Sequence, residues 1–223
     1  MEAAKTVFQG ADAVTRLARM GLKASQLLAA VAYGYHSYIS GSPNHPRFAL
    51  GIWSWAEVVM KLREFLLPLA WRSTDENNYS LTISDEHKVA IQVSSGDEFT
   101  GKPNATPETK AAKGLFTQLA VIANVAQLGL FSDEEDEAQR KKQPQARPEG
   151  DENATWVLLM YRDRVNKEVR CELSLPNSLG TDGKINDWAE RIILDPIPTD
   201  TTKVDVTVPK GPDIDVEVTR RTA

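Results

Sequence analysis

The sequence predicts an α+β fold: a mainly antiparallel sheet of two hairpins packed against two or three helices, with an acidic flexible linker. Three segments place apolar residues at helical spacing, and two pairs of segments alternate apolar with polar residues. The 223 residues, 41% of them hydrophobic, are enough for a sizeable core. We expect one domain made of residues 1–131 and 154–195, interrupted by a disordered linker at 132–153 and followed by an irregular tail at 196–223.

The first helical region covers residues 11–40, where apolar side chains such as Leu17 and Leu27 recur at spacings of three and four. It forms one helix or two, because Gly21 can end a helix and Ser25 can cap the next one by accepting a backbone N–H bond. Two helices in this order have a helix-turn-helix outline. The second segment is mostly Ala, Leu and Tyr, which favours a packed pair of helices over one that reads DNA bases.

Two further helices are indicated by apolar faces. The segment from Trp55 to Leu69 carries Trp, Val, Leu and Phe on one side and charged residues on the other. We expect it to cover one face of a sheet or to pack on the first helical region. The segment from Leu115 to Gly129 has a similar periodicity and ends at a glycine.

The strands come in two pairs. Residues 79–84 and 89–94 alternate apolar with small polar residues around a polar turn, which is typical of a β-hairpin. Residues 155–161 and 167–175 form the second pair, joined by the polar turn 162–166. Residues 185–194 fit either a short helix or a last strand, and we favour a strand for the part from Arg191 onward.

The strand at residues 167–175 has one apolar and one polar face. Cys171 belongs to the apolar face, so we expect a buried structural thiol rather than a nucleophile. The polar face consists of Glu168, Arg170, Glu172 and Ser174. Opposite charges spaced by two along a strand pair in water at little net gain, so we expect this face to be solvated.

Composition excludes several classes of site. Cys171 is the only cysteine and the chain has three histidines, so neither an intramolecular disulfide nor a zinc site of the usual Cys/His type can form, and no cofactor motif is present. The net charge of −5 disfavours a generic nucleic-acid binder, although residues 1–72 hold eight Lys and Arg against four acids and leave such contact open for that half. No apolar run is long enough for a membrane span, and we expect a cytoplasmic protein.

The candidate site is the long polar loop from Ser94 to Gly114, which follows the first hairpin and has no apolar periodicity. We expect it to bind a ligand together with a proline-flanked loop nearer the N-terminus and one basic side chain near the end of the domain. The candidate ligand-binding residues are Asp97, Glu98, Thr100, Lys102, Asn44, His45, Arg47 and Arg191.

Two function classes follow from this loop. The favoured one is a binding module that engages a protein partner or an anionic ligand. The alternative is an enzyme that acts on a phosphate-containing or nucleic-acid substrate, possibly metal-dependent, with Asp97, Glu98 and Lys102 at its centre. Nucleotide hydrolysis of the P-loop type is disfavoured, because Pro103 stands where a P-loop has its metal-binding hydroxyl. Mimicry of nucleic acid by the acidic linker ranks last, because a disordered run cannot order its carboxylates at phosphate-like spacing.

Short motifs also carry a resemblance. PNHP at residues 43–46, SSGDEFTG at 94–101, KG at 113–114, and ELSLP followed by WAERIIL at 188–194 make the chain similar to a group of uncharacterised bacterial proteins associated with plasmids and phages. The resemblance covers roughly residues 21–195 without the acidic linker. No activity is established for this group, so it implies no catalytic residues here.

Overall fold

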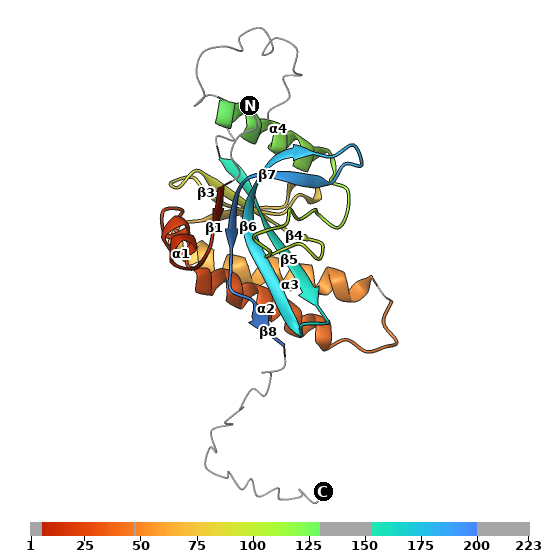
Figure 1. Cartoon of the computed structure of the whole chain (residues 1–223). Helices are drawn as coiled ribbons and strands as arrows, with labels where there is room; N and C mark the ends of the chain where they lie inside the picture. Colours follow the sequence, from red (N-terminus) through yellow and green to blue (C-terminus); the bar gives the residue numbers. More distant parts are fainter. Residues whose placement is uncertain (1–5, 47, 130–152, 200–223) are drawn as a thin grey trace, which may run out of the picture.

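A computed structural model describes residues 6–46, 48–129 and 153–199 of the chain (Figure 1). Within these ranges the protein has four α-helices and eight strands that form one mixed, open sheet, which confirms the α+β class. The predicted acidic linker lies outside the described residues except for Asn153, and the predicted tail is described only as far as Thr199.

The first helical region is two helices, α1 (Gly10–Ala18) and α2 (Ala24–Ile39). Gly21 separates them with a φ of +69°, where its amide donates to the carbonyl of Ala18 while the amide of Leu22 donates to that of Leu17. This is a Schellman motif, in which a left-handed glycine ends a helix by satisfying its last carbonyls. The second helix begins after Lys23, so Ser25 lies inside α2 and does not cap it.

The other predicted helices are also present. Helix α3 (Ala49–Leu66) continues into the 3₁₀ turn η1 (Leu67–Leu69), and α4 (Leu115–Gly129) follows the polar loop. A second 3₁₀ turn, η2 (Glu76–Asn78), precedes the first hairpin.

The strands follow the order β1-β7-β6-β5-β4-β3-β2 across the sheet, and β8 pairs with β6 beside this path. The parallel pairs are β1 with β7 and β4 with β5, and the other neighbours are antiparallel. Their bounds are β1 (Thr6–Phe8), β2 (Arg72–Thr74), β3 (Leu81–Ser84), β4 (Val89–Ser95), β5 (Ala154–Asp163), β6 (Glu168–Leu179), β7 (Ile185–Ile193) and β8 (Ile197–Pro198).

The sheet is thus larger than the two predicted hairpins, and it is mixed. Strand β5 does not start a separate antiparallel unit, because it lies parallel to β4 with Ala154 opposite Val89 and Met160 opposite Ser95. A parallel pair needs a long crossover connection, and here the polar loop, α4 and the residues after it lie between the two strands. Residues 185–193 are a strand throughout, so the helical alternative for this segment is wrong.

The sheet separates two layers (Figure 1). Helices α1, α2 and α3 cover one face, where residues such as Leu27, Leu62 and Leu158 form the main core. Helix α4 covers part of the other face, where Val121 packs with Leu159 and other buried residues of β5 and β7. The loop between β4 and α4 lies over β6 and β7 on that second face, which is where the candidate site begins.

Most of the polar face of β6 is buried by this loop and not solvated, contrary to expectation; Glu168, at the start of the strand, is partly exposed. Arg170, Glu172 and Ser174 are all buried, whereas the sequence pattern suggested a surface open to water. The expected inward position of Cys171 is confirmed: it is fully buried, and burial raises the pKa of its thiol to about 12. Such a thiol stays protonated near neutral pH and is a weak nucleophile.

Candidate ligand-binding pocket

The loop of residues 96–114 is tied to the sheet by backbone hydrogen bonds. Its amides donate to carbonyl oxygens of neighbouring strands and turns over N···O distances of 2.8 to 3.0 Å. The donor and acceptor pairs are Gly96 with Met160, Thr109 with Ile185, Lys110 with Ser95, and Lys113 with Gly183. Because both ends and the second half of the loop are bonded in this way, it forms a fixed surface rather than a free chain.

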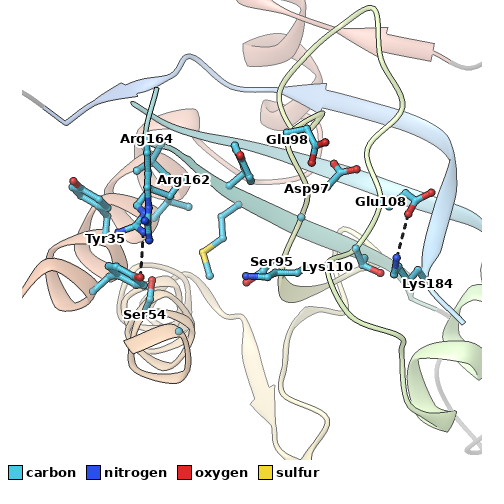
Figure 2. Close-up of a pocket in the computed structure, with 18 residues that line it drawn as sticks. Tyr35, Ser54, Ser95, Asp97, Glu98, Glu108, Lys110, Arg162, Arg164 and Lys184 are labelled. Atoms are coloured by element: carbon cyan, nitrogen blue, oxygen red, sulfur yellow. Dashed lines mark hydrogen bonds and ion pairs between the residues drawn. The ribbon is translucent and has the colours of Figure 1, made fainter. Parts of the chain in front are cut away.

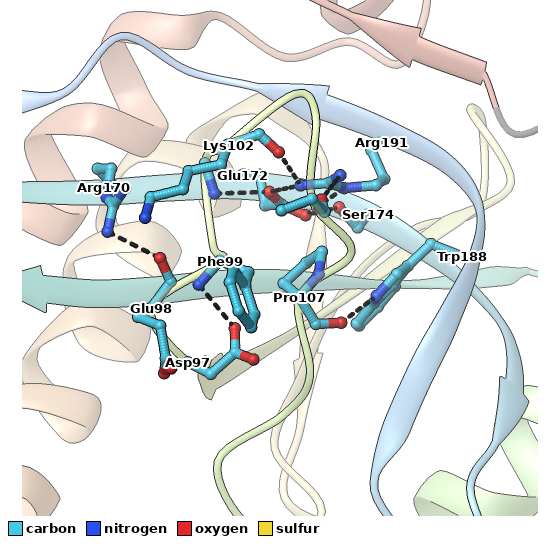
Figure 3. A network of polar contacts seen from close by, with 12 residues as sticks. Asp97, Glu98, Phe99, Lys102, Pro107, Arg170, Glu172, Ser174, Trp188 and Arg191 are labelled. Carbon is cyan, nitrogen blue, oxygen red and sulfur yellow. Dashed lines mark hydrogen bonds and ion pairs between the residues drawn. The ribbon is translucent and has the colours of Figure 1, made fainter.

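A buried ion pair lies beneath the loop (Figure 3). Arg191 of β7 donates to both carboxylate oxygens of Glu172 of β6, at 2.9 Å from Nε and 2.6 Å from Nη2. Glu172 also accepts the amide N–H of Gly101 at 2.8 Å. Arg191 also donates to the carbonyls of Lys102 and Ala105, at 3.1 and 2.6 Å. Since both charges are buried and need these partners, the pair fixes the middle of the loop to the sheet.

Further side chains hold the loop from below. Arg170 donates to the carbonyl of Glu98 at 3.0 Å, and the indole N–H of Trp188 donates to that of Pro107 at 2.8 Å (Figure 3). The loop also comes close to the strand at Gly101, whose φ is +75° and where an added Cβ would lie 2.9 Å from Cβ of Arg170. Only glycine combines this backbone conformation with this approach.

A pocket of about 460 Å³ lies where β4 and β5 end (Figure 2). Its walls are the start and second half of the loop, the end of β5 with the turn after it, the turn before β7, and the neighbouring parts of α2 and α3, while Val31, Met160 and Val169 add apolar lining. The volume lies within the range of small-ligand sites. Because β4 and β5 are parallel, the segments that follow them leave from the same edge of the sheet and gather their side chains there.

One wall of the pocket is basic and aromatic (Figure 2). The guanidinium of Arg162 lies 4.0 Å from the centre of the Tyr38 ring and donates to the Tyr38 hydroxyl at 3.2 Å. Arg164, which is exposed, and Tyr35 line the same wall. Within the described ranges neither arginine forms an ion pair, so both keep their charge available to a ligand.

The opposite wall carries carboxylates and lysines: Asp97 and Glu98, and further along it Glu108, Lys110 and Lys184 (Figure 2). Asp97 and Glu98 line it, and Oδ1 of Asp97 accepts the amide of Phe99 at 3.1 Å. Burial raises the pKa of Asp97 above its ordinary value, and the nearby Glu98 charge acts in the same direction. Glu108 lies 3.5 Å from Lys184, whereas Asp97 and Glu98 have no ion-pair partner in the described part of the chain. Unpaired carboxylates therefore face unpaired guanidinium groups across the pocket.

The predicted loop residues divide into two groups. Asp97 and Glu98 line the pocket, while Thr100 and Lys102 do not. Thr100 is fully buried within the loop, and the ammonium of Lys102 lies 5.8 Å from the centre of the neighbouring Phe ring. Arg191 lies under the loop and not in the pocket, so its contacts are those of a structural anchor.

The described residues of the proline-flanked loop between α2 and α3 do not line the pocket. The backbone of Asn44 donates to the Ser42 hydroxyl at 3.2 Å, and the His45 ring meets the edge of Trp53 with 4.7 Å between ring centres. Neither Asn44 nor His45 lines the pocket. Arg47 lies outside the described residues.

Sequence reasoning missed the basic wall. The sequence predicts only a polar turn at Arg162 and Arg164 and a packed helix at Tyr35 and Tyr38. Two arginines spaced by two at the end of a buried strand are the one local signal that could have indicated them. The contact of Arg162 with Tyr38 joins positions 124 residues apart, which no spacing rule predicts.

The described ranges were searched for metal sites and for membrane-spanning helices. No group of three or more His, Cys, Asp or Glu that could hold a metal ion occurs there. The carboxylates of Glu172 and Glu190 form ion pairs with Arg191 and Arg16. Among the described helices, none has the length and apolar content needed to cross a membrane.

Comparison of the chain with protein-family models, with curated proteins and with solved structures gave no match.

Proposed function

We propose that this chain is a binding module that holds a dipolar ligand in the pocket beside the 96–114 loop. An anionic group of the ligand lies against Arg162 and Arg164, and a cationic or hydrogen-bond-donating group lies against Asp97 and Glu98. The single observation that carries this proposal is that the carboxylates of Asp97 and Glu98, unpaired within the described residues, lie across the pocket from the guanidinium groups of Arg162 and Arg164 (Figure 2). A small molecule or a side-chain pair of a protein partner can present the same chemistry.

The basic wall is prepared for an anion. Tyr38 holds Arg162 by stacking and by a hydrogen bond, so less side-chain entropy is lost when a carboxylate or phosphate binds. A planar guanidinium offers two parallel N–H donors to such a group, and a charge-assisted bond of this kind is about twice as strong as a neutral one.

The acidic wall selects for the other end of the ligand. The carboxylate of Asp97 loses part of its hydration in the pocket, which is why its pKa is raised. A bound ammonium or N–H donor would replace that lost hydration and stabilise the charged form. A second anion placed there would instead be repelled by Asp97 and Glu98, which fixes the orientation of the ligand.

The test uses three probes of similar length: 6-aminohexanoate, glutarate and 1,5-diaminopentane. Amide chemical-shift changes in labelled protein report where each probe binds. We expect 6-aminohexanoate to bind most tightly and to shift the amides of residues 95–98 and 161–164. Arg164→Ala should weaken binding of 6-aminohexanoate and glutarate, whereas Asp97→Asn should weaken that of 6-aminohexanoate and diaminopentane.

Exposed residues outside the pocket supply the matched controls. Arg19→Ala and Asp195→Asn remove the same charges at positions that do not line the pocket, and they should leave all three affinities unchanged. The proposal is wrong if the three probes bind equally well, if their shifts map away from the pocket, or if Arg164→Ala and Arg19→Ala behave alike.

Two wider expectations stay predictions. An enzyme acting on a phosphate-containing substrate has less support than the binding module, because Lys102 and His45 do not line the pocket beside Asp97. An association with plasmids and phages rests on the short sequence motifs alone.

A further inference from the structure

A second polar cluster lies away from the pocket, on the face of β4 that is turned towards the loop and α4. Ser94 is buried near the end of β4, and the ammonium of Lys113, the last charged residue of the loop, donates to its hydroxyl oxygen. The Ser94 hydroxyl itself donates a long bond of 3.3 Å to the carbonyl of Ser95. A serine hydroxyl in contact with a lysine amine is one arrangement that activates a nucleophile.

Among the described residues, no acid pairs with the Lys113 ammonium. Burial lowers the pKa of Lys113 to about 8, and within the described ranges no carboxylate forms an ion pair with it. The acids of the adjoining segments, Glu108 and Asp182, contact Lys184 instead, at 3.5 and 3.1 Å. The nearby Lys110 is exposed. A substantial share of Lys113 is therefore neutral slightly above neutral pH, and a neutral amine can accept a proton where an ammonium cannot.

The surroundings leave hydrogen-bonding capacity unused. Gln92 lies two residues before Ser94 on the same face of β4, and its amide nitrogen donates to Thr117 at 3.2 Å. Its carbonyl oxygen is buried and has no hydrogen-bond partner among the residues that the structure describes, so it can accept a donor from a bound molecule. Ala112 and Gly114, on either side of Lys113, are exposed, which places the cluster close to the surface.

We propose that Ser94 and Lys113 form a nucleophile and general-base pair that accepts an acyl group from an ester. The neutral amine of Lys113 takes the hydroxyl proton as Ser94 Oγ bonds to the acyl carbon. The bond from that carbon to the leaving oxygen then breaks, and the Lys113 ammonium returns the proton to the departing alcohol. The products are acylated Ser94 and the alcohol, and attack by water would restore the serine and release the acid. This activity is separate from ligand binding in the pocket, because neither side chain lines it.

The experiment incubates the full chain with p-nitrophenyl acetate, quenches it in acid and locates the acetyl group by peptide mass spectrometry. We expect acetyl-Ser94, formed at a rate that rises with pH through about 8. Lys113→Met should slow this step about a hundredfold, in the range of general-base effects, whereas Lys110→Met, the matched change in the same loop, should not. Ser94→Ala should abolish labelling at this position.

The competing reading is that Lys113 only ties the loop to β4. It predicts that the wild-type protein shows no acetyl-Ser94 at any pH between about 6 and about 10, and this result would overturn the proposal even if the Lys113 variant failed to fold. Acetylation confined to lysine side chains, or an equal rate at Ser94 in the Lys113→Met and wild-type proteins, would overturn it too.

Discussion

Replacing Glu172 with glutamine should destabilise the protein strongly, because it leaves Arg191 as a buried charge without its counter-ion. The carboxylate accepts two bonds from Arg191, at 2.9 and 2.6 Å, one from Ser174 at 2.7 Å and one from the amide of Gly101 at 2.8 Å. A glutamine oxygen can replace only part of this set, and its amide group turns a donor towards other donors. Breaking a buried pair on one side costs about 3–5 kcal/mol.

This loss is large compared with the free energy of unfolding of a typical protein, which is about 5–15 kcal/mol. Urea unfolding followed by tryptophan fluorescence measures it, and the control is Glu64→Gln, which alters an exposed pair with Lys61 and should leave the urea midpoint close to that of the wild type. The double variant Glu172→Leu/Arg191→Met should be less destabilised than the sum of its single variants, because it leaves no unpaired buried charge. Additive losses, or a Glu172→Gln variant within about 1 kcal/mol of the wild type, would refute the reasoning.

Further predictions concern the loop, α4 and one surface pair. A left-handed backbone conformation costs a residue other than glycine about 1–2 kcal/mol of folding free energy. Gly10→Ala should lose only this amount, because Gly10 has a φ of +53° and open space around it, whereas Gly101→Ala should lose more, because its new Cβ would also approach Arg170. Chemical denaturation of both variants measures the difference. Asn124→Ala should cost about 2 kcal/mol or more, because it removes two bonds to the backbone of β5, at 2.8 and 2.9 Å; thermal melting measures it. The hydrogen bond from Arg63 is the largest cause that lowers the pKa of Asp75 to about 2, below its ordinary 3.8. The ionised Asp75 therefore contributes fully to the free energy of unfolding above about pH 4, and this contribution is lost as the pH falls towards 2. Asp75→Asn should flatten the acid side of a plot of stability against pH.

Much of the fold follows from local patterns. Helix α3 shows a polar and an apolar side in its sequence, and Gly21 marks the break between α1 and α2 because only glycine adopts its left-handed backbone cheaply. Strands β1 and β2 were missed, since three residues are too few to show an alternation. The parallel contact between β4 and β5 was missed because pairing direction is set by the long connection between them and leaves no mark on either strand.

Of the two walls of the pocket, only the one with Asp97 and Glu98 could be predicted from the sequence. Asp97 and Glu98 stand in a polar loop without periodicity, which is a usable signal for a site. Glu172 and Arg191 looked like solvated or ligand-binding charges, because the sequence does not tell which segment covers them. The basic wall depends on Tyr38 meeting Arg162, a contact between distant segments that packing alone decides.

The anchoring of the 96–114 loop is tested most directly by amide hydrogen exchange. The amides of Gly96, Gly101, Thr109, Lys110 and Lys113 donate to protein acceptors, so they should exchange far more slowly than those of an unfolded peptide. Glu172→Gln should raise the exchange rate of Gly101 more than that of Gly96, because only Gly101 donates to this carboxylate. Exchange of all five amides at the rate of a free chain would show that the loop is not a fixed wall and would contradict the account.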